Sequence, residues 1–142
     1  MSLVNTIQTQ TLGIPGRSMS SAGKNHWLVD GAAHSGGPAE GPAPADMFLS
    51  GVSACAVLLI EKLAEADGLP LDRALCTITG VRDEADTSWF QSVSLAFELR
   101  GLDRPTSEDL VTRFTQKCPL YRTVAAATNV TWSVQESLAA VA

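Results

Sequence analysis

The feature that most constrains this sequence is the stretch from Pro42 to Ala66, which is typical of one long helix with Cys55 near its middle. Pro44 suits the first helical turn, where its missing N–H costs nothing, and Asp46 then falls at the positive end of the helix dipole. Between Met47 and Ile60 nearly every residue is apolar or small, so we expect this helix to be buried on most of its surface. The rest of the chain must fold around it.

The overall composition is that of a globular domain. The chain has 142 residues, enough for one domain with a real core, and a net charge of -5, which argues against nucleic acid or an anionic membrane as partner. The longest apolar run, Val52 to Ile60, is too short to cross a bilayer. The N-terminus lacks the pattern of a signal peptide, so the expected compartment is the cytoplasm. Three widely spaced cysteines without C-x-x-C predict neither a disulfide framework nor a zinc site.

Before the long helix, the pattern predicts a β-meander. Loose alternation and turn residues favour three strands, at residues 2–12, 17–20 and 26–30. The stretch from Gly31 to Pro44, with four glycines and three prolines, cannot be regular structure and must be a loop leading into the helix.

After the helix, the pattern predicts a β-hairpin, two helices and a final strand. Val93, Leu95, Phe97 and Leu99 alternate with polar residues, and this strand should pair with a strand at residues 71–83. Thr106 opens a capping-box pattern ahead of a helix, and a second short helix follows Pro119. A last strand is expected at residues 130–134, and the tail from Ser137 should be frayed. The sum is one α+β domain over residues 1–142 with no internal boundary.

The three thiols carry different expectations. Cys118 precedes Pro119, so it should be the N-cap of the short helix, where the dipole and the nearby Lys117 and Arg122 favour a thiolate. The alternative is a buried cysteine at a helix junction. Cys55 alone would more often be a small core residue than a reactive one, and Cys76 is expected to be core.

Two segments carry a family resemblance. Residues 36–55, GGPAEGPAPADMFLSGVSAC, and residues 117–122, KCPLYR, resemble the signature segments of the OsmC/Ohr family (osmotically inducible protein C and organic hydroperoxide resistance proteins). The family pattern is a Gly-rich loop, a proline and an acidic residue opening a long Cys-bearing helix, and a later Cys-Pro. The predicted order of elements also matches the family fold.

The resemblance implies a thiol-dependent peroxidase for organic hydroperoxides, active in oxidative or osmotic stress defence. It implies an intertwined homodimer with its sites at the subunit interface and a small hydrophobic hydroperoxide as substrate. Cys55 would be the peroxidatic thiol and Cys118 the resolving thiol, with an external dithiol as reductant and no metal, haem or flavin.

The resemblance also implies that an arginine from the N-terminal strands activates the thiolate, held by a glutamate at the start of the long helix. Arg17 is the only arginine before the helix. Ala45 stands where the better-known branch has glutamate, and Asp46 is one position later, as in an OsmC-like branch. The alternative is that Asp46 only complements the dipole and Arg17 is a solvated charge.

Two other functions therefore stay open. Without the arginine–carboxylate clamp, Cys55 could stay an inert thiol, and the protein would be a non-catalytic OsmC-like protein that binds a small apolar ligand or partner. A weaker third alternative is a thiol-dependent enzyme with another electrophilic substrate.

Overall fold

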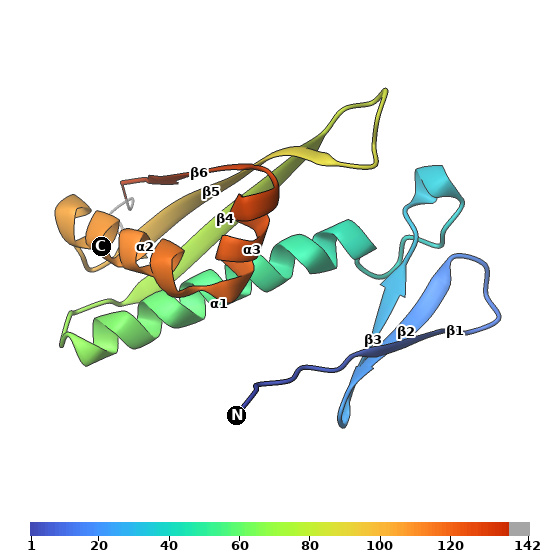
Figure 1. Cartoon of the computed structure of the whole chain (residues 1–142), viewed down its shortest axis with the longest axis horizontal. Helices are drawn as coiled ribbons and strands as arrows, with labels where there is room; N and C mark the ends of the chain where they lie inside the picture. Colours follow the sequence, from blue (N-terminus) through green and yellow to red (C-terminus); the bar gives the residue numbers. More distant parts are fainter. Residues whose placement is uncertain (137–142) are drawn as a thin grey trace, which may run out of the picture. The chain divides into compact units, whose positions relative to one another are not determined.

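The computed structural model describes residues 1–136, and within it the chain divides into two compact units. Unit 1 is residues 1–48 and unit 2 begins at residue 49; each is described by itself (Figure 1). The expected fraying of the tail from Ser137 lies outside the described residues. The expectation of a single domain stays a prediction.

Unit 1 is a three-stranded antiparallel sheet of order β1-β2-β3, as the meander pattern predicts. The strands are β1 (Gln8–Thr11), β2 (Arg17–Ala22) and β3 (Asn25–Asp30), so the first strand is shorter than the predicted range 2–12. The predicted loop follows β3 and contains one short 3-10 turn, η1 (Ala33–Ser35), which the sequence did not indicate.

Unit 2 contains a second sheet, of order β4-β5-β6. The predicted hairpin is confirmed: β4 (Arg73–Arg82) pairs antiparallel with β5 (Phe90–Arg100), and β6 (Asn129–Val134) adds parallel to β5. The alternating residues of β5 face the core, since Val93, Leu95, Phe97 and Leu99 are all buried. They share that core with buried side chains of all three helices, so the helices pack on one face of the sheet (Figure 1).

The long helix α1 (Pro44–Ala66) begins at the predicted proline. Asp46 Oδ2 accepts a hydrogen bond from the Ala43 amide at 2.9 Å, the return half of a capping box. The expectation that the helix is buried on most of its surface is wrong within one chain: its buried residues form one stripe of Val52, Ala56, Ile60, Leu63 and Ala64. The reason is geometric: α1 packs against the sheet and the two shorter helices along one face, and its opposite face has no neighbour within residues 49–136 to cover it.

The apolar character of α1 also bears on membranes. α1 is the one helix in the described chain that is long and apolar enough to be a candidate span, with a mean hydropathy of 1.7 over its best window. The uninterrupted apolar run from Val52 to Ile60 is shorter than this helix, so that run alone did not indicate a candidate span. One such helix is weak evidence, because the core helix of a soluble protein passes the same test.

The two shorter helices follow directly on one another. α2 (Arg104–Lys117) starts earlier than predicted: its N-cap is Asp103, whose side chain accepts from the Thr106 amide at 2.9 Å. The predicted capping box at Thr106 is therefore wrong, because Asp103-Arg104-Pro105 already provides an acceptor and a first-turn proline. α3 (Pro119–Ala127) has Cys118 as its N-cap, which confirms that prediction.

Candidate active site

The two cysteines of the sequence motif meet in the core of unit 2. Cys118 Sγ donates a hydrogen bond to Cys55 Sγ, and the two sulfurs are 2.9 Å apart although 63 residues separate them in the chain. Both cysteines are free thiols; Cys118 is fully buried and Cys55 is half-buried. A pair at this separation is poised for thiol–disulfide chemistry, with Cys55 the more accessible sulfur.

Each thiol is positioned by the local sequence. Cys55 lies one position before the buried Ala56 on α1, so it sits beside the core stripe. Cys118 ends α2, where its amide donates to Phe114 O at 2.9 Å, and begins α3, where its sulfur accepts from the Tyr121 amide at 3.4 Å. Pro119 cannot continue α2 but fits the first position of α3, so the chain turns at this sulfur.

An aromatic cluster supports this junction. The Phe114 ring packs edge-on against Phe97 of β5, with centroids 5.9 Å apart, and against Tyr121 of α3, with centroids 5.2 Å apart. Phe97 and Phe114 are fully buried. The cluster therefore ties the helix junction that bears Cys118 to the sheet.

The electrostatics within unit 2 disfavour a thiolate at Cys55. Burial raises the pKa of the Cys55 thiol to about 11, and the hydrogen bond and proximity of Cys118 add to that shift. In residues 49–136, no cationic side chain hydrogen-bonds to either sulfur. Cys76, on β4, is half-buried, and burial alone raises its pKa to about 11, in keeping with the predicted core role. An activating charge for Cys55 must come from outside these contacts.

Arg17 lies in unit 1, in an ion-pair network that the sequence reading missed. Its Nε donates to Asp30 Oδ1 at 2.9 Å, and its Nη2 donates to Asp30 Oδ2 at 2.8 Å and to Glu40 Oε2 at 2.5 Å. The Arg17 side chain is 15% exposed, so it is not a solvated charge. The hydrogen bond to Asp30, and to a smaller extent the one to Glu40, raises the pKa of Arg17 further above its ordinary value. In return, the hydrogen bond from Arg17 holds the pKa of Asp30 below its usual range.

Asp46 has a different partner from the one its position suggested. Within unit 1, the carboxylates that bind Arg17 are Asp30 and Glu40, whereas Asp46 closes the first turn of α1. A catalytic role for Asp46 stays a prediction.

A signal for Asp30 was present in the sequence. The turn at Gly23-Lys24 makes β2 and β3 a hairpin in which Ala22 pairs with Asn25. Counting back from that pair places Arg17 opposite Asp30, and directly opposed residues share a face. The contact of Glu40 with Arg17 could not be predicted in this way, because Glu40 lies in a loop and strand pairing does not fix the position of loop residues.

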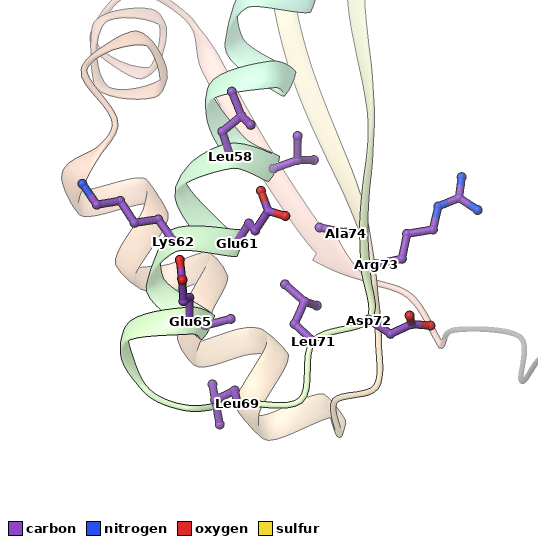
Figure 2. Close-up of a pocket in the computed structure, with 11 residues that line it drawn as sticks. Leu58, Glu61, Lys62, Glu65, Leu69, Leu71, Asp72, Arg73 and Ala74 are labelled. Carbon is purple, nitrogen blue, oxygen red and sulfur yellow. The ribbon is translucent and has the colours of Figure 1, made fainter.

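Each of the two units contains a cleft. One of about 570 Å³ lies in unit 2 beside the C-terminal half of α1; Leu58, Leu69 and Leu71 contribute apolar surface, and charged side chains surround them (Figure 2). Neither thiol of the pair lines it. The other, of about 430 Å³, lies in unit 1 and is lined mainly by apolar side chains, among them Ile7, Trp27, Val29 and Met47. In residues 1–136, no three His, Cys, Asp or Glu side chains come together as metal ligands.

Comparison with known proteins now decides the family. The model of the family described as OsmC-like protein matches residues 37–133, more than half of the chain. The chain belongs to the OsmC-like family. The resemblance in the two cysteine segments is thereby confirmed at the family level.

Solved structures of this family share the fold. An OsmC-like protein from Mycoplasma pneumoniae superposes with a TM-score of 0.82 at 19% identity, covering 96% of this chain and 99% of that one. The organic hydroperoxide resistance protein OsmC from Legionella pneumophila gives 0.75 at 18%, covering 94% and 97%. The organic hydroperoxide resistance protein OhrB of Bacillus subtilis gives 0.69 at 19%, covering 94% and 98%. The OsmC/Ohr α+β fold is thus confirmed; no curated protein gives a match.

Proposed function

We propose that this OsmC-like protein is a thiol-dependent peroxidase that reduces organic hydroperoxides through Cys55 and Cys118. The observation that carries the proposal is the 2.9 Å separation of the half-buried Cys55 sulfur from the fully buried Cys118 sulfur. The half-buried Cys55 is assigned the peroxidatic role and the fully buried Cys118 the resolving role, since an incoming peroxide must reach the first sulfur and not the second.

The reaction divides into three balanced steps. The Cys55 thiolate attacks the hydroxyl oxygen of the peroxide and the O–O bond breaks, so that Cys55 becomes a sulfenic acid. The departing alkoxide takes up the proton that the thiol lost on ionisation and leaves as the alcohol. The Cys118 thiolate then attacks the Cys55 sulfur and displaces hydroxide, which a proton converts to water, so that a disulfide forms. An external dithiol reduces that disulfide through a mixed disulfide and becomes oxidised itself. Cys118 is suited to its part, because its sulfur lies 2.9 Å from the Cys55 sulfur that it must attack.

The first step needs a cation. Because burial raises the pKa of Cys55 to about 11, the thiol stays almost entirely un-ionised at pH 7. Arg17 is the candidate that the family resemblance offers, and we include its activation of Cys55 in the proposal. A guanidinium near the sulfur would lower the thiol pKa and stabilise the negative charge that develops on the peroxide oxygen.

The proposal also covers the oligomeric state, the substrate and the cellular compartment. Leu58 on α1 is 63% exposed, and only 28% of the apolar window of that helix is buried, so a second copy of the chain would cover apolar surface that one chain leaves open. We therefore propose the intertwined homodimer of the family. A small hydrophobic hydroperoxide is the proposed substrate, without a metal or organic cofactor, and the cytoplasm is the proposed compartment.

Intact-mass measurement after one equivalent of cumene hydroperoxide tests the proposal. Wild-type protein should lose two hydrogens within the time that free cysteine takes to react only slightly. Cys118→Ser should instead gain one oxygen, trapped by a sulfenic-acid reagent, and Cys55→Ser should not react. Cys76→Ser is the matched control and should behave as wild type. A wild-type rate no faster than that of a free thiol would refute the proposal.

The second candidate is a non-catalytic OsmC-like protein that binds a small apolar ligand. The raised pKa of Cys55 favours it, because an un-ionised thiol is a poor nucleophile. The apolar cleft of unit 1 supplies a possible volume. In that case the mass would stay unchanged with peroxide, while an apolar fluorescent probe would bind at micromolar concentration.

A further inference from the structure

Asp30 is a charged side chain with no exposure to solvent. Its side chain is 0% exposed, and both of its oxygens accept hydrogen bonds from donors of unit 1. Besides Arg17, it accepts from the Gly41 amide at 2.9 Å and from the Glu40 amide at 3.1 Å. A carboxylate buried in this way is tolerated only because donors satisfy both oxygens, and it then holds those donors in fixed positions.

The Gly-rich loop that supplies the two amides is itself held in place. A Cβ on Gly37 would lie 2.0 Å from the Gly31 carbonyl oxygen, so only glycine permits this backbone contact. The Asp30 amide donates to Pro42 O at 3.0 Å, and Gly31 N donates to Gly16 O at 2.7 Å. Ala39, next to Glu40, has a left-handed φ of 53°, a backbone conformation that is unfavourable for a non-glycine residue. The loop is therefore fixed by several contacts around Asp30.

Among the residues of unit 1, the guanidinium of Arg17 donates hydrogen bonds through Nε and Nη2 only. Asp30 and Glu40 together occupy the Nε–H and both Nη2–H groups. Within residues 1–48, Nη1 has no hydrogen-bond partner. A planar guanidinium held along one edge by a bidentate carboxylate directs its remaining N–H groups in a defined direction.

We propose that Asp30 is the positioning residue for Arg17: its buried carboxylate holds Nε and Nη2 in place and leaves the Nη1 N–H groups for the negative charge that the proposed reaction develops. Asp30 on β3 thus does what the family resemblance assigned to an acidic residue at the start of α1. This inference rests on the proposed function, because Arg17 must act on Cys55.

Glu40 is the weaker of the two carboxylates. It is 74% exposed and contacts Arg17 through one oxygen, whereas Asp30 binds through both oxygens and is buried. An exposed ion pair is screened by water and salt and contributes little. Glu40 is therefore expected to be dispensable.

The test compares four single variants and one double variant by pH profile. The readouts are kcat/KM for cumene hydroperoxide and the rate of Cys55 alkylation by iodoacetamide, both from pH 5 to pH 10. Arg17, Asp30 and Glu40 are the charged groups that contact one another in this network, and Cys118 is the titratable group against Cys55 in unit 2. Asp30→Asn keeps the side-chain shape but weakens the grip on Arg17, so the alkylation midpoint should rise by about one pH unit and kcat/KM at pH 7 should fall about tenfold.

The controls separate positioning from mere folding. Glu40→Gln should change kcat/KM by about twofold or less. Asp67→Asn removes a carboxylate that binds Arg113 through both oxygens in unit 2, and it should leave both profiles unchanged. Arg17→Met should lose the most activity, and Asp30→Asn should add nothing to Arg17→Met. A loss that is purely structural would lower the amplitude of the profile without moving its midpoint.

The outcomes are distinguishable. An active wild type with an Asp30→Asn profile identical to that of Asp67→Asn would overturn the role of Asp30 alone. A wild type without peroxidase activity would overturn the proposed function and this inference with it. Should Asp30→Asn fail to fold, hydrogen exchange of the arginine Nε–H groups in the wild-type protein decides. Arg17 should exchange at least tenfold more slowly than the exposed Arg73, and equal rates would refute the fixed guanidinium.

Discussion

Oxidation of the Cys55–Cys118 pair should stabilise the fold strongly, because the bond would close a long loop. The two residues are 63 apart in sequence. In the chain-entropy account, a cross-link over that separation removes about 14 cal/mol/K from the unfolded ensemble, or about 4 kcal/mol at 25 °C. With a urea m-value of about 2 kcal/mol/M, the unfolding midpoint should rise by about 2 M. Since the two sulfurs already lie in contact in the reduced fold, little of this gain should be lost to rearrangement of the backbone.

The assay is urea unfolding, followed by tryptophan fluorescence, of protein oxidised by one equivalent of cumene hydroperoxide and of the same protein after reduction. Protein concentration is held equal, because association would also shift the midpoint. Cys118→Ser should show no oxidative shift, and Cys76→Ser should show the wild-type shift. A non-reducing gel checks that the bond lies within one chain. An oxidised protein that has lost two hydrogens but unfolds at the reduced midpoint would refute the entropy reasoning.

Three further predictions concern the supports of the site. Phe114→Ala should lower the free energy of unfolding by about 3–5 kcal/mol, because it empties a fully buried aromatic site, while the exposed Gln116→Ala should change it by less than about 0.5 kcal/mol in the same urea assay. Gly37→Ala should destabilise by about 1–3 kcal/mol in thermal unfolding because its Cβ meets backbone, whereas Gly51→Ala, whose Cβ meets only Leu120 at 3.9 Å, should be neutral or stabilising. The low pKa of Asp30 stabilises the folded state fully above its unfolded-state pKa of about 3.9 and loses that effect as pH falls through the folded-state pKa, so Asp30→Asn should flatten the acid limb of a stability–pH curve.

Local patterns predicted most of the secondary structure. The alternation in β5 placed four residues on the buried face, and Pro119 after Cys118 placed the start of α3. These features depend on the period of the backbone and on single-residue backbone chemistry, both of which are readable in a short window. Element ends were less predictable: β1 is shorter than its pattern, and Asp103 rather than Thr106 caps α2, because competing caps lie within three residues of one another.

The site was predictable only as far as its motifs. The family resemblance named Cys55, Cys118 and Arg17, and the structure places the two sulfurs in contact. The exposure of α1 was not predictable, since the same apolar sequence suits a helix covered by its own chain and one with open apolar surface.

The sequence by itself determined which residues form the strands and helices, where the chain turns, and which thiols to examine, because these follow from periodicity, proline and glycine. Only the tertiary structure decided what those residues contact. It gave Arg17 the buried Asp30 and the loop residue Glu40 in place of Asp46, because hairpin register and the close contact of Gly37 with Gly31 set those neighbours. It also set the pKa of Cys55, because the pKa of a thiol depends on its burial and on the groups around it. Neither can be predicted from the neighbouring residues in the sequence.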